Sequence, residues 1–274
     1  MILTISTALL AGGKKSCCGP TPTETFAAFG KDMAFVALHD APAPLAWQSS
    51  GGIERQLPVD GGPDARIYQV SPPERTRSFL FVFHEWWGLN DYIKREAERL
   101  QQELGNVEVI AVDLYDGAIA AVPESARVFV GRVKDARARA IIASVTKFAG
   151  PDARIATLGW CFGGGWSMQS ALMLGPQAAG CVIYYGMPEQ DPAKLAALHC
   201  DVLGIFALRD GFITPAVVTE FQQNMKKAKK KVDVLNFDAV HAFANPSNPK
   251  YDSAMSAQAH TAALAFLRRS LRIQ

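Results

Sequence analysis

The sequence predicts an α/β fold, with a mostly parallel central sheet and helices on both of its faces. Short apolar runs alternate with longer stretches of helical periodicity, which is typical of a parallel sheet with crossover helices. Polar residues repeatedly follow the apolar runs, so they would gather at one edge of such a sheet. The chain has 274 residues, of which 49% are hydrophobic and 20% charged, and it is long enough to bury a large core as one domain.

The apolar runs give the predicted strands. Each run is short and is bounded by turn-forming residues, as strands usually are. The runs lie at residues 67–70, 79–83, 107–112, 155–158, 181–185, 201–208 and 232–237. We expect the first of them to be an edge strand. No internal repeat and no second domain are evident.

Helices are predicted between these strands. They cover residues 91–104, 123–148 in two pieces around Gly131, 163–174, a stretch from Pro215 onward, and 252–271. Asn90 is a good N-cap for the first of them, and Gly105 closes it. The basic run at residues 226–231 falls at a helix end, where cations suit the helix dipole, so we interpret it as a solvated terminus.

The strongest chemical signal is Gly-Trp-Cys-Phe-Gly at residues 159–163, directly after the apolar run 155–158. A strand that enters a tight glycine-flanked turn and then a helix is a nucleophile elbow, here with Cys161 in the place of serine. Side chains two residues before and after the nucleophile would clash with neighbouring backbone, which explains the glycines. The helix N-terminus would favour a thiolate. A merely packed cysteine remains the alternative.

Two further residues, an aspartate and a histidine, follow predicted strands downstream of Cys161. Asp210 comes directly after the predicted strand 201–208, and His241 follows the strand 232–237. Alone, Asp210 before a glycine would be a turn residue, and His241 a loop histidine. Nucleophile, acid and histidine in this order, each past the carboxyl end of a strand, is the arrangement of an α/β-hydrolase fold.

A fourth motif follows the apolar run 79–83. It is His-Glu-Trp-Trp-Gly-Leu-Asn at residues 84–90. With it, the chain resembles the dienelactone hydrolase family over roughly residues 63–272. The matching residues are the turn at 84–90, Asp113-Leu114-Tyr115, Gly159-x-Cys161-x-Gly163-Gly164, Tyr184-Tyr185-Gly186, Asp210, and His241 followed by Phe243.

The resemblance implies roles for the site residues. Cys161 would be the nucleophile, His241 its base, and Asp210 the residue that orients the imidazole. Glu85 would be the partner that holds the resting thiol until substrate displaces it; a plain turn residue is the alternative for Glu85. A carboxylate near the sulfur would disfavour its ionisation by like-charge repulsion, whereas His241 would favour it.

The resemblance also implies an oxyanion hole formed by the backbone N–H groups of Trp86 and Phe162. Four tryptophans fall near the predicted site, and they either belong to the core or line an apolar acyl pocket. They are Trp86, Trp87, Trp160 and Trp166. We expect Trp160 to contact substrate.

One position departs from the family pattern. The family holds a substrate carboxylate with arginines, one of them four residues beyond the catalytic histidine, where this chain has Asn245. Asn245 would still contact substrate, but asparagine lacks the charge and the bidentate geometry of arginine. Arg127 and Arg132 do not align with the family's other arginine. The catalytic residues therefore transfer better than the substrate.

The N-terminus predicts a leader. Residues 1–19 resemble an export signal or lipoprotein-like leader, with an apolar stretch too short to span a membrane and Cys17 as a conceivable lipid acceptor. No Lys or Arg precedes the apolar stretch. The sequence leaves localisation open and favours export, periplasmic or lipid-anchored, over the cytoplasm. We expect residues 20–62 to be a tether or an N-terminal wrap before a hydrolase domain at 63–274.

The composition of the chain and the spacing of its histidines and cysteines limit which ligands and partners we expect. The net charge of +2 gives no argument for nucleic acid. The five histidines (39, 84, 199, 241 and 260) show no ligand spacing and no glycine-rich loop suits a phosphate, so we expect neither metal nor cofactor. Five cysteines do not form a disulfide framework in a chain this long. We expect a monomer that acts on a small molecule.

The sequence therefore predicts a hydrolase that cleaves a small ester, lactone or thioester through a cysteine acyl-enzyme. Two other classes remain as alternatives. One is a non-enzymatic, surface-tethered binding protein on the same fold. The other is a redox-sensing thiol protein whose Cys161 oxidises readily.

Overall fold

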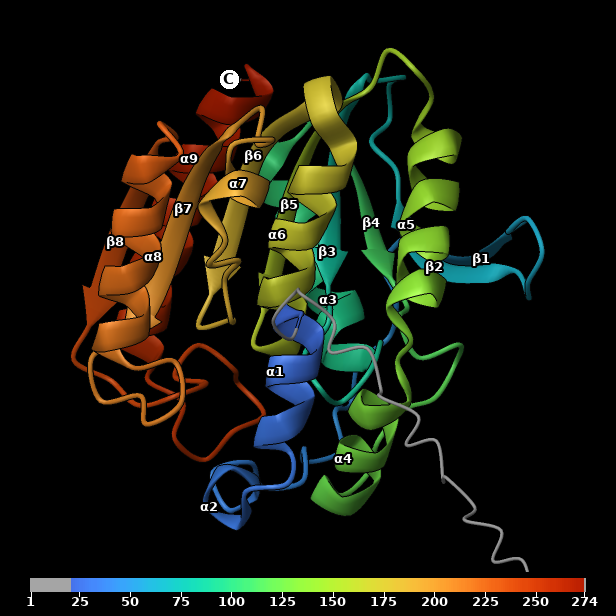
Figure 1. Ribbon diagram of the computed structural model, residues 1–274. Coiled ribbons are helices and arrows are strands. Elements are labelled where there is room, and N and C mark those ends of the chain that lie inside the picture. The colour runs from blue at the N-terminus through green and yellow to red at the C-terminus, as the bar shows by residue number, and fades with distance from the viewer. Residues whose placement is uncertain (1–20, 274) are drawn as a thin grey trace, which may run out of the picture.

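The computed structural model describes residues 21–273, which form a twisted sheet between two layers of helices (Figure 1). The sheet is eight-stranded, in the order β1-β2-β4-β3-β5-β6-β7-β8. Strands β3 to β8 run parallel to one another, whereas β1 pairs antiparallel with β2 and β2 pairs antiparallel with β4. The fold is the predicted α/β-hydrolase fold.

The strands follow the predicted apolar runs closely. They are β1 (Ile53–Leu57), β2 (Ala65–Val70), β3 (Ser78–Phe83), β4 (Glu108–Val112), β5 (Arg154–Trp160), β6 (Ala178–Tyr184), β7 (Asp201–Ala207) and β8 (Val232–Phe237). Strands β3 and β5 are almost completely buried, because helices cover both faces of the sheet there. Glu85 follows β3 and Cys161 follows β5, both at the carboxyl ends of these central strands.

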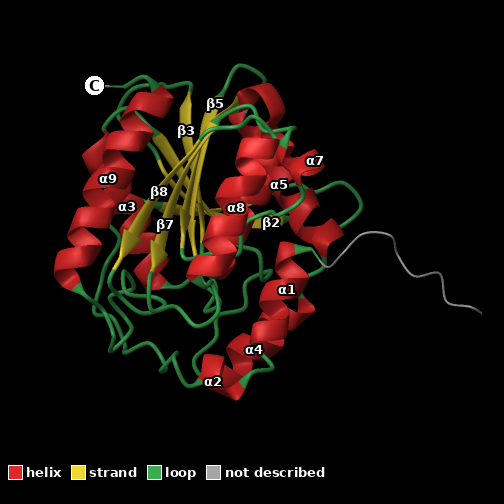
Figure 2. Ribbon diagram, turned by 60° about the vertical axis from the view of Figure 1, so that its left-hand side comes forward, coloured by secondary structure: helices red, strands yellow, loops and turns green. Residues whose placement is uncertain are grey.

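The helices lie in two layers (Figure 2). They are α1 (Pro22–Phe29), α2 (Met33–Val36), α3 (Asp91–Leu104), α4 (Pro123–Arg132), α5 (Asp135–Ala149), α6 (Phe162–Leu174), α7 (Pro192–Leu195), α8 (Pro215–Lys227) and α9 (Ser253–Leu271), with a short 3₁₀ turn at Gly175–Gln177. Helices α3 and α9 cover one face, and α5, α6 and α8 cover the other. Asn90 caps α3 and Gly105 ends it, as predicted.

One strand prediction is wrong. Residues 65–70 do not form an edge, because β1 pairs with β2 on its outer side. The first four residues of β1 are exposed, so this strand carries no apolar pattern by which the sequence reveals it. The sheet thus starts ten residues before the predicted domain boundary at residue 63.

The segment before the sheet is folded and packed against the domain. Helix α1 contacts α6 and α4, and α2 follows it at the carboxyl end of the sheet (Figure 1). Further along, Glu98 of α3 accepts hydrogen bonds from Ser49, from Ser50 and from the backbone N–H of Gly52. The segment is therefore a wrap rather than a loose tether over its described part.

The predicted leader at residues 1–19 lies outside the described residues. Among residues 21–273, no helix combines the length and the apolar character that crossing a membrane requires.

Candidate active site

The turn after β5 has the backbone of a nucleophile elbow. Cys161 has φ 58° and ψ −118°, a region that non-glycine residues rarely adopt and that costs on the order of 1–3 kcal/mol. A Cβ on Gly159 would lie 2.1 Å from the carbonyl oxygen of Gly163, and a Cβ on Gly163 would lie 2.2 Å from that of Phe83. The glycines are therefore a steric requirement, as the sequence predicts.

Three side chains from three strand ends form one hydrogen-bonded chain. Nε2 of His241 lies 3.3 Å from Sγ of Cys161, and Nδ1 of His241 lies 2.6 Å from Oδ2 of Asp210. The other carboxylate oxygen of Asp210 accepts the backbone N–H groups of Phe212 and Ile213. All three side chains are buried. The structure thus brings together the three residues that the sequence singles out.

The electrostatics around Cys161 favour a neutral thiol at rest. Burial raises the pKa of Cys161 well above its usual range, and the nearby Glu85 carboxyl raises it further. Hydrogen bonds from the backbone N–H groups of Phe162 and Trp86 offset part of this rise. Burial also acts on Asp210, but His241 and the backbone donors outweigh it and lower the pKa of Asp210. The N-terminus of α6 would favour the thiolate of Cys161, but burial and the Glu85 carboxyl group outweigh this effect.

Glu85 lies beside this chain without a hydrogen bond to the sulfur among the described residues. Tyr185 Oη donates to its Oε1 over 3.2 Å, and Nδ2 of Asn245 donates to its Oε2. Burial raises the pKa of Glu85 to about 7, although His241, Tyr185 and Asn245 each lower it in part. Glu85 is thus a buried carboxyl group that is half-protonated near neutral pH and that influences Cys161 through space.

A cavity of about 260 Å³ opens next to these residues. Glu85, Tyr185 and Asn245 line it, whereas Cys161 and His241 do not. The remaining wall comes mostly from α3 and from the loop before α9, including Trp87, Tyr92, Arg95, Glu96, Arg99, Trp160, Tyr184, Tyr251 and His260. The carboxyl group of Glu85 therefore contacts both the cavity and the surroundings of the thiol.

The N-terminal wrap closes the other side of the thiol. Phe35 of α2 packs against the rings of Trp86 and His241, at centroid distances of 5.4 and 5.6 Å. His39 is 2% exposed, and its Nδ1 donates to the carbonyl oxygen of Phe35 over 2.8 Å. Burial, together with the nearby His241, lowers the pKa of His39 to about 3, so its ring is neutral.

A family model described as the dienelactone hydrolase family matches residues 66–271 of this chain. The chain belongs to the dienelactone hydrolase family. A protein of Aquifex aeolicus provisionally named a carboxymethylenebutenolidase is 25% identical over 217 residues, which cover 74% of this chain and 93% of the relative.

Solved structures agree on the fold. A provisionally named dienelactone hydrolase from Klebsiella pneumoniae superposes with a TM-score of 0.70 at 22% identity, covering 80% of this chain and 98% of that one. P91, described as a dienelactone hydrolase-like promiscuous phosphotriesterase from metagenomic libraries, superposes with a TM-score of 0.66 at 21% identity and the same coverage. Membership of the family makes the protein a hydrolase.

Some of the residues considered from the sequence line the cavity, and others lie elsewhere. Trp160 and Asn245, which the sequence predicts to contact substrate, line the cavity, and Asn245 also binds Glu85. Arg127 and Arg132 lie on α4 and do not line this cavity. Of the tryptophans, Trp87 and Trp160 line the cavity, whereas Trp86 and Trp166 are core residues.

Sequence reasoning assigned no role to three residues of the site, although Tyr185 belongs to one of the matching motifs. Tyr185 follows the end of β6, so it shares the strand-end position that revealed Asp210 and His241. Its signal was available in the sequence. Phe35 and His39 had none, because they lie in a segment with little periodicity and reach the thiol only through the tertiary fold.

Proposed function

We propose that this member of the dienelactone hydrolase family cleaves small carboxylic esters, lactones or thioesters through an acyl-enzyme on Cys161. The observation that carries the proposal is the hydrogen-bonded chain from Cys161 through His241 to Asp210 at a strained elbow. A nucleophile, a base in contact with it and a group that orients the base are what covalent hydrolysis requires.

The first half of the reaction would form the acyl-enzyme. Substrate enters the cavity and displaces the Glu85 carboxyl group, which removes a like charge from beside the sulfur. His241 takes the thiol proton and Sγ attacks the substrate carbonyl carbon. The oxyanion lies against the N–H groups of Trp86 and Phe162, which already point at the sulfur. The C–O or C–S bond breaks as His241 protonates the leaving group.

The second half would release the acid. His241 takes a proton from water, and the hydroxide attacks the thioester on Cys161. The resulting tetrahedral intermediate expels Sγ, which regains a proton from His241. Asp210 keeps Nδ1 of His241 protonated throughout, so that Nε2 is the nitrogen that exchanges protons.

The alternatives fit the site less well. Readily oxidised cysteines are exposed and have a lowered pKa, whereas Cys161 is 1% exposed and its pKa is raised by burial. A binding protein would not need a strained nucleophile in contact with a buried histidine–aspartate pair. These features favour hydrolysis.

The test replaces the nucleophile. Cys161→Ala is expected to abolish hydrolysis of a small activated ester, because the acyl intermediate has no other attachment site, and mass spectrometry of the wild type should map an acyl adduct to Cys161. Cys200→Ala removes a free thiol at the start of β7, at the opposite end of that strand from Asp210, and is the matched control, with activity retained. Full turnover in pure Cys161→Ala would refute the proposal.

A further inference from the structure

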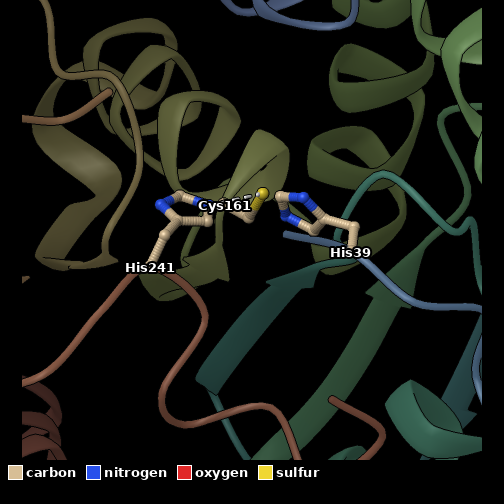
Figure 3. A group of neighbouring side chains, drawn as sticks. All are labelled: His39, Cys161 and His241. Atoms are coloured by element: carbon tan, nitrogen blue, oxygen red, sulfur yellow. Dashed lines mark hydrogen bonds between the residues drawn. The ribbon is translucent and has the colours of Figure 1, made fainter. Parts of the chain in front are cut away.

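Two histidine rings meet at the sulfur of Cys161 (Figure 3). His39 comes from the loop after α2, and His241 from the loop after β8. Nitrogens of both rings and the Sγ of Cys161 all lie within 4.8 Å of one another, and all three residues are buried. Because the ligands come from distant parts of the chain, their spacing in the sequence gives no sign of this cluster.

Hydrogen bonds fix which nitrogen each ring offers. A carbonyl oxygen only accepts, so Nδ1 of His39 carries the proton that it donates to Phe35, and Nε2 is left with a lone pair. Asp210 binds Nδ1 of His241 in the same way, so Nε2 of His241 also offers a lone pair to the sulfur. Both rings thus present the nitrogen form that binds metals.

His39 is left without a partner for this lone pair. Its Nε2 is buried and has no hydrogen-bond partner among the described residues. The single thiol proton of Cys161 is shared with His241 and cannot satisfy both rings. Leaving a buried acceptor unsatisfied costs about 1–3 kcal/mol. A Lewis acid placed between the three atoms would remove this cost.

We propose that His39 Nε2, His241 Nε2 and the Cys161 thiolate bind one Zn²⁺ ion, with a single buried water molecule as the fourth ligand. Two imidazoles and one thiolate form a ligand set that zinc favours. Tetrahedral zinc with ordinary bond lengths places such ligand atoms roughly 3.3–3.6 Å apart. The His241–Cys161 distance of 3.3 Å is close to this range, and no pair of ligand atoms is more than 4.8 Å apart, so small side-chain shifts would complete the geometry.

The surroundings suit a bound dication. The Phe35 carbonyl and the Asp210 carboxylate hold the outer nitrogens of the two ligand rings, which is the usual support for zinc-bound histidine. The carboxyl group of Glu85 lies beside the sulfur, and its charge offsets that of the metal. Binding converts Zn²⁺ and the thiol into a zinc thiolate and releases the thiol proton to water.

Metal binding would occupy both the nucleophile and its base. Inhibition of hydrolysis by zinc therefore rests on the proposed function, but the binding itself does not. Zinc in solution would then lower the activity of the enzyme, and His39 would be the ligand that makes this inhibition possible. His39 lies outside the family match at residues 66–271.

The binding test uses the full chain with Cys17→Ser and Cys18→Ser as background, because two adjacent thiols would bind metal themselves. Co²⁺ is added to metal-free protein and followed by absorption, then displaced with Zn²⁺. We expect one Co²⁺ per chain, with the charge-transfer band of a thiolate–cobalt bond, and complete displacement by Zn²⁺. Absence of that band in a folded background protein would overturn the proposal.

Variants locate the ligands. His39→Ala and His39→Gln are expected to weaken zinc binding by about two powers of ten or more, since a lost ligand should cost at least as much as a lost outer-shell partner. Circular dichroism checks that both variants are folded. His199→Ala, at an exposed histidine, is the matched control and should bind like the background protein. Unweakened binding in both His39 variants would overturn the assignment of His39.

Discussion

Folding removes the Glu85 carboxyl group from water, and this burial raises its pKa. Burial raises its pKa from 4.5 to about 7, so the folded protein binds this proton more tightly than the unfolded chain. The stabilising contribution of protonated Glu85 is complete below pH 4.5 and is lost as the pH rises through 7. A shift of this size corresponds to about 3 kcal/mol.

Glu85→Gln removes this titration. We expect the free energy of unfolding of the variant, relative to that of the wild type, to be larger at pH 8 than at pH 5 by on the order of 3 kcal/mol. Urea unfolding of both proteins at the two pH values measures this difference. Alkylation of Cys161 by iodoacetamide should also rise, because a like charge is gone, and turnover should fall if Glu85 controls activation. Glu74→Gln, at an exposed carboxyl group, is the control. An equal free-energy difference at the two pH values would contradict the prediction.

The cavity also predicts a preference in substrate charge. Asn245 supplies no cation, and Glu85 lies at the wall, so the wild type should prefer a neutral ester over its analogue with a free carboxylate. A charged hydrogen bond is worth about 1.5–3 kcal/mol, so Asn245→Arg should shift relative kcat/KM toward the anion by one to two powers of ten. The measurement is a matched pair of esters, one with the carboxylate methylated.

The contrary result has a specific explanation in the cavity. Arg95 lines it and forms no ion pair with a described carboxylate, although it lies over the ring of Tyr92. A wild-type preference for the carboxylate, lost in Arg95→Gln, would show that Arg95 takes the role that Asn245 cannot fill.

Much of the site was predictable at the residue scale, for a geometric reason. Cys161 and Asp210 follow the buried strands β5 and β7, and His241 follows β8 at the edge of the sheet. Parallel strands bring their carboxyl ends to one edge. The same rule applies to Tyr185, which follows β6. Tyr185 donates a hydrogen bond to Glu85, the residue that the sequence predicts to hold the thiol. His39 follows no strand, and nothing local marks it as a neighbour of Cys161.

At the scale of elements, the elbow depends on backbone packing at Gly163. A Cβ there would lie 2.2 Å from the carbonyl oxygen of Phe83, so Gly163→Ala is expected to destabilise the protein by several kcal/mol or prevent soluble expression. Gly131→Ala, in α4 with open space around it, should stabilise by about 0.5–1 kcal/mol. Thermal unfolding of both variants checks this contrast, and equal effects would contradict it.

The elements themselves were largely predictable, and the one missed strand shows the limit. Helix α3 was expected with its bounds because a capping asparagine and a closing glycine mark them. Strand β1 is mostly polar and is stabilised by pairing with β2 rather than by burial, so only the tertiary structure reveals it.

At the scale of the whole molecule, the N-terminal wrap and the hydrolase domain share one core. Phe35→Ala should cost about 3–5 kcal/mol and should speed alkylation of Cys161 in native buffer, because the ring covers the site. Phe221→Ala is the matched control, since it removes an equally buried ring on α8. Equal alkylation rates in both variants would mean that the wrap does not limit access.

The wrap also sets an order of events during synthesis. Nδ2 of Asn248 donates to the carbonyl oxygen of Leu38, a contact between residues 210 positions apart. A ribosome that adds about 5–20 residues per second needs roughly 10–40 seconds to cover that stretch. The N-terminal segment thus leaves the ribosome before the residues it packs against, so the nascent chain carries Phe26 and Phe35 uncovered while the central strands are still being made.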